Sequence, residues 1–272
     1  MNSLKSKRQI EKMRAAGLLV WHAHQIGAAL SRPGMTTGEI DKRMERFFLD
    51  HGAQPLFKGV PGRVPFPATC CMSVNEEVVH GIPGRRVLKE GDILSIDTGC
   101  RFDGWCGDAA VTHPIGKIAT DTQKLLDVTR RVLEIAIEAI PSCEYWTEVA
   151  RQMEKEVIDN GFSVVESLVG HGIGREMHED PQVPNYVCSE FFRVGADFKL
   201  QPGLVIAVEP MVNMGSKRVT LQKDHWTMST IDRKPSAHFE HTLAITEDGV
   251  LVLTGPPLEG ENYYDIEKYI RV

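Results

Sequence analysis

The chain repeats one order of sequence features, and this repeat limits the folds that it can adopt more than any other feature. In the first half, a His-Gly-Ile motif at His80 precedes a short apolar strand that begins at a glycine and delivers Asp97. In the second half, the same motif at His171 precedes a similar strand that delivers Glu209. The gap between motif and strand is longer in the second half, which therefore carries an insertion. The repeat predicts two halves related by approximate two-fold symmetry.

A pair of helices is predicted ahead of each set of strands. Apolar residues recur at helical spacing in four segments, namely 7–30, 37–51, 121–140 and 144–160. Thr36 with Glu39 predicts a capping box at the start of the second helix, and Thr120 with Gln123 predicts another at the start of the third. Gly161 is predicted to follow the fourth helix as a left-handed C′ residue.

The two halves cover about residues 5–115 and 116–255, and no Pro/Ser-rich linker separates them. We therefore expect a single domain, residues 1–272, in which both halves share one core. Helix pairs that alternate with short strands and tight turns predict an α/β (α+β) fold. Its strands are expected to be mostly antiparallel, with the helices on one face.

Composition excludes several classes of protein. With 272 residues, 42% of them hydrophobic and 25% charged, the chain is an ordinary globular protein rather than a disordered or fibrous one. A net charge of −6 with scattered basic residues gives no electrostatic footprint for nucleic acid. The six cysteines form no Cys-x-x-Cys pair, so neither a zinc module nor a disulfide framework is indicated. The N-terminus lacks the apolar core of a secretory signal, and no apolar run approaches the roughly 18 residues of a membrane span, so we expect a cytoplasmic protein.

Two aspartates stand on a predicted hairpin. Asp103-Gly104 is a strong signal for a two-residue hairpin loop, and it would place Gly99 opposite Asp108. Asp97 then points to the same face as Asp108 and lies diagonal to it, at about 7–8 Å. Two carboxylates at this separation repel each other unless a positive charge lies between them.

Two interpretations of these acids are open. They are either solvent-exposed acids on an open sheet face or the ligands of a metal. The strand that carries Asp97 is otherwise apolar, and a buried carboxylate needs a partner. The only cation nearby, Arg101, lies four residues away along the strand, so we favour a metal site.

The second half offers further ligands. Glu209 ends an apolar strand, Glu240 lies in a predicted strand over 237–246, and His171 is surrounded by glycines. Taken alone, Glu240 is an ordinary surface acid and His171 a structural histidine. Together with Asp97 and Asp108 they form an oxygen-rich set, which suits two divalent ions better than a single thiolate-bound zinc. Two such ions share a water and clamp a carbonyl, so the chemistry implied is hydrolysis.

These residues resemble those of a known family, the type I methionine aminopeptidases. The likeness covers about residues 5–255 and rests on the five ligands in order, four acids and one histidine, together with the motifs around His80, His171, His178 and Glu209. The resemblance implies the pita-bread fold, a pseudo-two-fold antiparallel sheet with two helix pairs on its outer face. It also implies removal of the N-terminal methionine from nascent polypeptides whose second residue is small.

The resemblance assigns a role to each candidate residue. Asp97 would hold one ion, Asp108 and Glu240 would bridge, and His171 and Glu209 would complete the second site. Two divalent ions are implied (Co, Mn, Fe or Zn), with a bridging water or hydroxide as nucleophile.

Three residues are implied to act on the substrate and its proton. His178 would stabilise the carbonyl oxygen, His80 would contact the substrate amide, and Glu209 would shuttle the proton. A free α-amine is able to bind metal directly, which explains exopeptidase action.

The resemblance also places a methionine pocket. Matching pocket positions are occupied by Phe66, Cys71 and Trp226, a sulfur–aromatic environment suited to a thioether, although ordinary core packing is an alternative for Phe66. Three features depart from the family pattern. Met177 stands where a phenylalanine is usual, residues 60–63 lack the usual cysteine and tyrosine, and the segment 185–199 is longer than in the simplest members.

The expected partners are the N-termini of nascent polypeptides near the ribosome, with no nucleic acid or membrane partner and a monomeric chain. Two other functions remain open at this point. A proline-directed peptidase of the same fold would normally carry an additional N-terminal domain. A catalytically inactive binding module would lack one or more ligands, and none is missing here.

Overall fold

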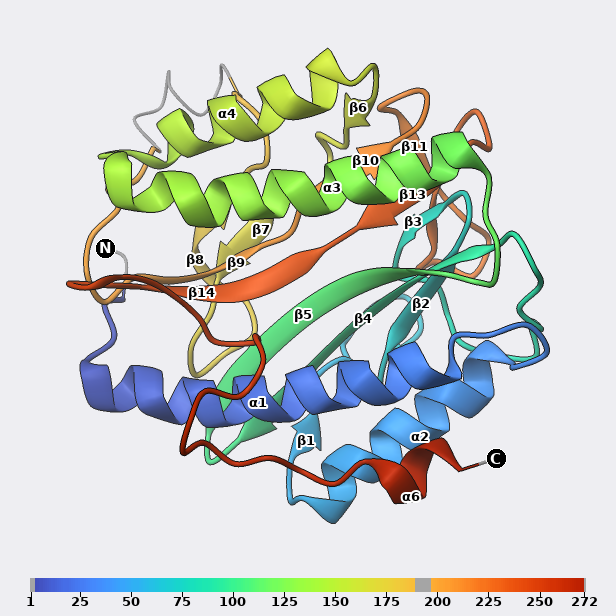
Figure 1. Ribbon diagram of the computed structural model, residues 1–272, viewed down its shortest axis with the longest axis horizontal. Helices are drawn as coiled ribbons and strands as arrows, with labels where there is room; N and C mark the ends of the chain where they lie inside the picture. The colour runs from blue at the N-terminus through green and yellow to red at the C-terminus, as the bar shows by residue number, and fades with distance from the viewer. Residues whose placement is uncertain (1–2, 189–196, 272) are drawn as a thin grey trace.

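A curled antiparallel sheet of nine strands carries the fold in the computed structural model, which describes residues 3–188 and 197–271 (Figure 1). Its strands are β1 (Gln54–Pro55), β2 (Cys71–Val74), β4 (Ile93–Phe102), β5 (Trp105–Pro114), β7 (Gly170–Gly172), β8 (Glu179–Val183), β9 (Val205–Val208), β14 (Glu240–Thr246) and β15 (Gly249–Val252). The main path runs β1-β4-β5-β14-β9-β7-β8, while β2 pairs with β4 and β15 with β14. Strands of the two halves thus meet where β14 lies between β5 and β9.

Two small sheets complete the strand structure. One is formed by β13 (Ser236–His238), β10 (Met211–Asn213) and β6 (Ser163–Val164), the other by β11 (Val219–Leu221), β12 (Met228–Thr230) and β3 (Glu77–Val79). The strand predicted over 237–246 is therefore two strands, interrupted at Phe239, whose N–H donates to the carbonyl of Pro210. This interruption lets β13 join a small sheet while β14 enters the centre of the large one.

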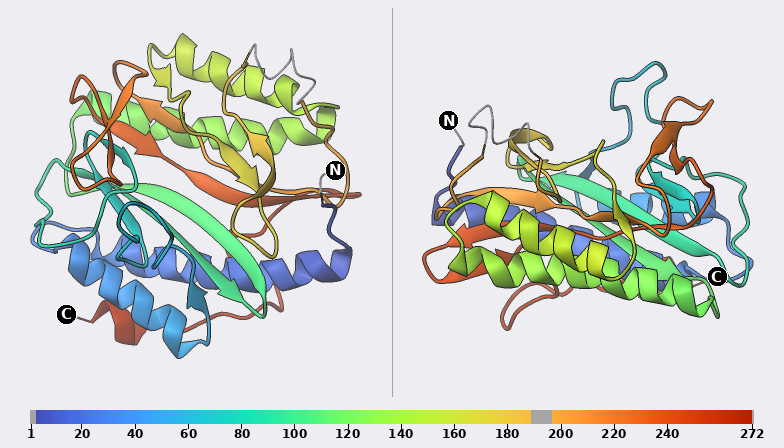
Figure 2. Two further views of the ribbon diagram at one scale, coloured as in Figure 1. Left: turned by 180° about the vertical axis from the view of Figure 1, so that it is seen from behind. Right: turned by 90° about the horizontal axis from the view of Figure 1, so that it is seen from above.

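Two helix pairs cover the same face of the large sheet, as the view from above shows (Figure 2). The helices are α1 (Lys7–Leu30), α2 (Thr37–Asp50), α3 (Thr120–Ala139), the 3₁₀ turn η1 (Ile140–Ser142), α4 (Trp146–Asp159) and the short α6 (Glu267–Ile270). One hydrophobic cluster joins α1 and α2 to β2 and β4, and another joins α3 and α4 to β9 and β14. The predicted pita-bread architecture with a helix pair for each half is confirmed.

The helix ends follow local sequence signals with one exception. The capping box of Thr36 and Glu39 forms, and Gly161 follows α4 with a φ of 81°, as predicted. The capping box predicted for Thr120 is wrong, because Ala119 occupies the N-cap and Thr120 is already helical. Gln123 donates instead to Asp127, one turn along the helix.

The hairpin that carries the two aspartates has the predicted register. Phe102 lies opposite Trp105 and Gly99 opposite Asp108. Helix α1 approaches this hairpin at backbone distance, since a Cβ at Gly107 would lie 2.9 Å from the backbone nitrogen of Gly17. Glycine at position 107 therefore lets α1 support the strand directly beneath the neighbouring aspartate.

The C-terminal segment is held on α1 by a buried arginine. The guanidinium of Arg14 donates to the carbonyls of Leu253, Gly255 and Pro256 and forms an ion pair with Glu261 at 2.7 Å. The Nη atoms of one side chain thus satisfy backbone carbonyls of a segment that has little regular structure, while Nε and Nη2 also donate to the carboxylate of Glu261.

Candidate metal centre and active site

The five predicted ligands converge from adjacent strands in the middle of the sheet. Asp97 lies on β4, Asp108 on β5 and Glu240 on β14. Glu209 directly follows β9, and His171 lies on β7. Because β4, β5, β14, β9 and β7 are consecutive in the sheet, residues that are far apart in the sequence line one cavity.

Asp108 is buried and Asp97 is partly buried, so the alternative of solvent-exposed acids on an open sheet face is wrong. Asp97 lies opposite Ala110, which makes it the diagonal neighbour of Asp108, and the side chain of Asp108 is 3% exposed. Arg101 does not neutralise them, since its guanidinium pairs with Glu176 at 2.7 Å. The carboxylates are thus left without the cation that the sequence offers nearby.

Burial and mutual repulsion disfavour the charged forms of these acids. Burial raises the pKa of Asp97, Asp108 and Glu240 well above the usual carboxyl range, and repulsion among the carboxylates raises it further. One carboxylate oxygen of each of the three has no hydrogen-bond partner among the described residues. Buried oxygens that lack donors are satisfied by a cation, so this donor set fits a divalent metal.

His171 completes the set with a nitrogen ligand. Ligand atoms of Asp108, His171 and Glu240 all lie within 4.8 Å of one another. The Nδ1 of His171 lies 2.9 Å from the carbonyl of Gly172. When Nδ1 donates its proton there, the lone pair of Nε2 is free, and this atom lies 3.8 Å from Glu209. A backbone carbonyl that fixes the tautomer in this way is typical of histidines that bind metal.

His80 and His178 lie beside the carboxylates without belonging to the ligand set. The rings of His178 and His171 meet edge to face, with centroids 4.4 Å apart. Burial lowers the pKa of His80, an effect that Glu209 partly offsets. Burial also lowers the pKa of His178, and the neighbouring His171 lowers it further. Both imidazoles are therefore neutral near pH 7, each with one N–H to donate.

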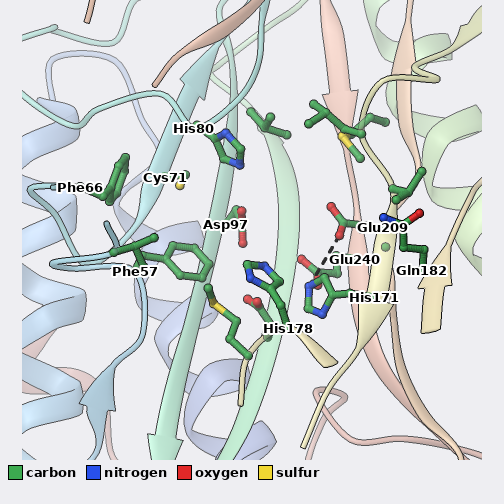
Figure 3. Close-up of a pocket in the computed structure, with 18 of the residues that line it drawn as sticks. Phe57, Phe66, Cys71, His80, Asp97, His171, His178, Gln182, Glu209 and Glu240 are labelled. Carbon is green, nitrogen blue, oxygen red and sulfur yellow. Dashed lines mark ion pairs between the residues drawn. The ribbon is translucent and has the colours of Figure 1, made fainter. Parts of the chain in front are cut away.

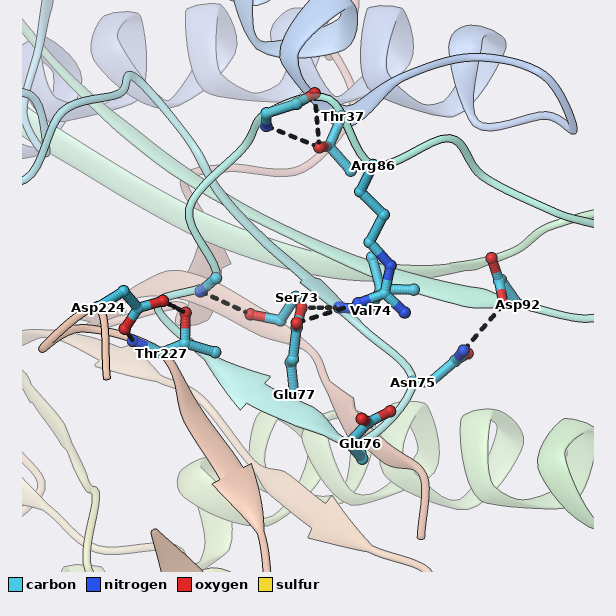
Figure 4. Close-up of polar contacts among 12 residues, drawn as sticks. Thr37, Ser73, Val74, Asn75, Glu76, Glu77, Arg86, Asp92, Asp224 and Thr227 are labelled. Atoms are coloured by element: carbon cyan, nitrogen blue, oxygen red, sulfur yellow. Dashed lines mark hydrogen bonds and ion pairs between the residues drawn. The ribbon is translucent and has the colours of Figure 1, made fainter. Parts of the chain in front are cut away.

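Polar contacts of Ser73 and Glu77 (Figure 4) hold the backbone next to His80. His80 has a φ of 60°, in the left-handed region, and the N–H of Gly81 donates to the hydroxyl of Ser73. Glu77 accepts from the N–H of Val74 and pairs with Arg86. These contacts hold a left-handed histidine in place, and such strain is commonly found at functional sites.

An apolar wall closes the cavity opposite the carboxylates (Figure 3). The cavity has a volume of about 720 Å³. The four residues predicted for the methionine pocket all line it, namely Phe66, Cys71, Met177 and Trp226. The rings of Trp226 and Phe66 meet edge to face, with their centroids 5.2 Å apart. The indole N–H of Trp226 donates to the carbonyl of Val64 at 2.8 Å. The residues predicted for the pocket therefore lie together in the structure.

Several residues that line the cavity were not predicted. They are Phe57, Val60, Val79, Leu168, Met211 and Gln182. Phe57 and Val60 belong to the loop after β1, and Leu168 precedes β7. No pattern in the sequence marks them, because they reach the cavity through the tertiary arrangement of loops. The segment 185–199 is the one predicted to be longer than in the simplest family members. Its residues 189–196 lie outside the described part of the chain.

His238 is a further residue that sequence reasoning missed. Its side chain is 1% exposed, and neither ring nitrogen has a hydrogen-bond partner among the described residues. Its Nε2 lies 3.6 Å from Glu209. The available signal was its position two residues before Glu240, on the strand that leads into the ligand. His238 thus lies near one oxygen of Glu209 and His171 near the other.

None of the helices in the described part of the chain is long and apolar enough to cross a membrane.

Comparisons with known proteins agree with the site. The model of metallopeptidase family M24 matches residues 11–247. The methionine aminopeptidase 1 of Bacillus subtilis is 45% identical over 92% of this chain and 98% of its own length, and a methionine aminopeptidase of Clostridium perfringens has the same identity and coverage.

Solved structures give the same answer. The crystal structure of the Thermotoga maritima methionine aminopeptidase superposes with a TM-score of 0.87 at 40% identity, over 93% of this chain and 99% of that one. The prolidase of Pyrococcus furiosus, with a TM-score of 0.70 and 20% identity, shares the fold alone. The chain belongs to metallopeptidase family M24, among its methionine aminopeptidases.

Proposed function

We propose that the chain removes the N-terminal methionine from polypeptides whose second residue is small. It is a hydrolase and an exopeptidase that uses divalent metal. The observation that carries the proposal is the pairing of a buried, unneutralised carboxylate cluster with an apolar cavity lined by sulfur and aromatic side chains. The first of these features supplies the hydrolytic chemistry, and the second selects the side chain.

The donor set is proposed to hold two divalent ions, cobalt, manganese, iron or zinc. Asp97 would bind one ion, Asp108 and Glu240 would lie between the two, and His171 with Glu209 would bind the other. When bound, the ions supply positive charge that lowers the pKa of a water and polarises the scissile carbonyl. The three unpartnered carboxylate oxygens and the free Nε2 of His171 support this assignment.

Three side chains are proposed to transfer the proton of the attacking water, to stabilise the negative charge on the carbonyl oxygen and to bind the substrate amide. Glu209 would accept the proton of the attacking water and pass it to the leaving amine. His178 would donate its N–H to the carbonyl oxygen as that oxygen gains negative charge, an interaction that favours the transition state over the substrate. His80 would bind the substrate amide. Burial supports these roles, because it lowers the pKa of both histidines and keeps each one a neutral donor near pH 7.

The methionine side chain is proposed to enter the apolar end of the cavity. Phe57, Phe66, Met177 and Trp226 form an apolar cluster there with Cys71. Burial, and next the charge of Asp97, raise the pKa of Cys71 far above its usual value. Its sulfur therefore stays an uncharged thiol and packs as an apolar group beside a thioether.

We also propose that residues 1–272 act as a single catalytic domain with halves at about 5–115 and 116–255. Its support is the division of the ligands, since the first half supplies Asp97 and Asp108 and the second supplies the other three. The chain would act in the cytoplasm as a monomer on nascent polypeptides near the ribosome, without a nucleic acid or membrane partner.

Two peptides test the proposed function. The metal-loaded protein should release methionine from Met-Ala-Ser and do so much faster than from Met-Leu-Ser, and Asp97→Ala should abolish both reactions. The proposal fails if the wild type leaves Met-Ala-Ser intact with every divalent metal tried. Equal rates on the two peptides would refute the preference for a small second residue.

A further inference from the structure

The loop that carries His178 has no helix or strand of its own. Residues 173–178 connect β7 to β8, and all of them are described. Within the loop, the N–H of Gly174 donates to the carbonyl of Glu176. Met177 and His178 stand at its far end and both line the cavity. Groups outside the loop must therefore hold these two side chains in position.

Glu179, the residue after His178, folds the loop back on itself. Its Oε1 accepts the N–H of Arg175 at 2.7 Å and that of Glu176 at 3.2 Å. The side chain of Glu179 thus binds the start of the loop, while the backbone of Glu179 follows its end. The position of His178 depends on this carboxylate, because the two residues are adjacent in the chain.

The other oxygen of Glu179 is bound by a lysine from the start of the chain. The ammonium of Lys5 lies 2.6 Å from Oε2, and the side chains of Lys5 and Glu179 are only 5% and 19% exposed. Burial alone would raise the pKa of Glu179, but Lys5 and the two loop N–H groups lower it below the ordinary value. The carboxylate is therefore charged at neutral pH and depends on the lysine for compensation.

Lys5 is itself fixed in position before it reaches the loop. Its backbone N–H donates to the carbonyl of Gly203 at 2.6 Å, and its ammonium also donates to the carbonyl of Ser3. Its stem passes against the Cα of Gly174, where an added Cβ would lie 2.6 Å from the lysine Cε. The absence of a side chain at Gly174 makes room for the lysine beneath the loop.

Three further contacts hold the middle of the loop. The carbonyl of Gly174 accepts the N–H of Cys106, and the guanidinium of Arg175 lies over the ring of Trp105 at 4.2 Å. Arg101 pairs with Glu176 at the surface. All three contacts act on residues 174–176. The end of the loop next to His178 is held by the pairing of Glu179 with Gly172 of β7, by the ring of His178 against that of His171, and by the side chain of Glu179. Lys5 fixes the last of these contacts.

We propose that Lys5 is a positioning residue of the peptidase: its ion pair with Glu179 holds the 173–179 segment so that His178 and Met177 face the bound substrate. Lys5 lies ahead of residues 11–247, which the family model matches. This inference rests on the proposed function, since it assigns the loop a place in that reaction. Lys5 does not touch the reacting atoms and acts only through Glu179.

The test compares Lys5→Met with Lys12→Met in the full chain. Lys12 is a matched control, since its ion pair with Asp103 is exposed at the surface. Lys5→Met should lower kcat/KM for Met-Ala-Ser on the order of 10- to 100-fold, mostly through kcat, because small misplacements of a catalytic group are costly. Lys12→Met should stay within about two-fold of the wild type, which is the usual effect of removing an exposed ion pair. Lys5→Arg, which keeps the charge, should recover part of the loss.

Hydrogen exchange gives a readout that needs no activity. In the metal-free protein, the amides of Arg175 and Glu176 should exchange faster in Lys5→Met than in the wild type or in Lys12→Met. Adding Glu179→Gln to Lys5→Met removes the uncompensated charge and should restore part of kcat.

The outcomes separate this inference from the proposed function. An unchanged kcat/KM in Lys5→Met overturns the inference, and so does a lower kcat/KM without faster exchange in the loop, which would indicate general destabilisation. If the wild type cleaves no methionyl peptide, the proposed function fails. Faster loop exchange in Lys5→Met would then still establish Lys5 as the anchor of the loop.

Discussion

Lowering the pH should destabilise the fold through His24, a buried histidine on α1. Its side chain is 4% exposed, its Nε2 lies 2.8 Å from the carbonyl of Ala109, and its Nδ1 has no partner among the described residues. Burial lowers the pKa of His24 from 6.5 to about 4, although the bond to Ala109 opposes this shift. The neutral ring, with a proton on Nε2, is therefore the form that the fold accepts.

The sign and size of the effect follow from the two pKa values. The folded protein binds this proton less readily than the unfolded chain, so the contribution to stability is complete above pH 6.5 and is lost as the pH falls towards 4. A pH of 5 lies about 1.5 units below the pKa of histidine in the unfolded chain. Protonation of the unfolded chain then lowers the free energy of unfolding by about 2 kcal/mol.

Urea unfolding of the metal-free protein between pH 8 and pH 5 measures this loss. His24→Gln keeps a donor for Ala109 but cannot be protonated, so its unfolding free energy should fall by about 2 kcal/mol less than that of the wild type over this range. Other titrating groups are common to both proteins, so they cancel in the difference. Parallel pH profiles for the two proteins would refute the reasoning.

Three further predictions concern the ligands, the pocket and the C-terminal segment. Asp108→Asn should raise the Tm measured in EDTA, because it removes one of the repelling buried carboxylates. It should also abolish the rise in Tm that divalent ions give the wild type by mass action. A lower Tm in EDTA would contradict the repulsion argument. Trp226→Leu should raise KM for Met-Ala-Ser more than it lowers kcat, because Trp226 belongs to the apolar wall; steady-state kinetics that show an effect on kcat alone would exclude this role. Arg14→Met should lower the free energy of unfolding, measured in urea, by about 3–5 kcal/mol, since it leaves Glu261 and several carbonyls without their donor. A loss below about 1 kcal/mol would show that the C-terminal segment is held by other contacts.

The ligand geometry could be predicted from the sequence because it depends on local rules. The Asp103-Gly104 loop sets the register of β4 and β5, and the two-residue period of a strand then brings Asp97 and Asp108 to one face. The capping signal at Thr36 is equally local. At Thr120 the same type of signal failed, since the neighbouring Ala119 takes the N-cap and the helix begins one residue earlier.

The rest of the site depends on contacts between distant segments. Phe57 and Met211 reach the cavity because a loop after β1 and a strand of a small sheet both lie beside it, and no periodic pattern in the sequence indicates this. His238 gave no signal beyond its closeness to Glu240. The role of Lys5 depends on a tertiary contact, since the segment before the first helix packs against a loop about 170 residues later in the chain.

The position of β14 has a consequence for the order in which the molecule can be assembled. This strand is among the last to be synthesised, yet it lies between β5 and β9 and joins the strands of both halves. Until it inserts, the large sheet consists of two separate pieces, and the site lacks the carboxylate of Glu240. Pairing at such sequence separation is slow compared with local folding. With the proposed ligand set, we expect full metal capture to be a late event in the life of each chain, and we expect a truncated product of translation that ends before β14 to cleave no peptides.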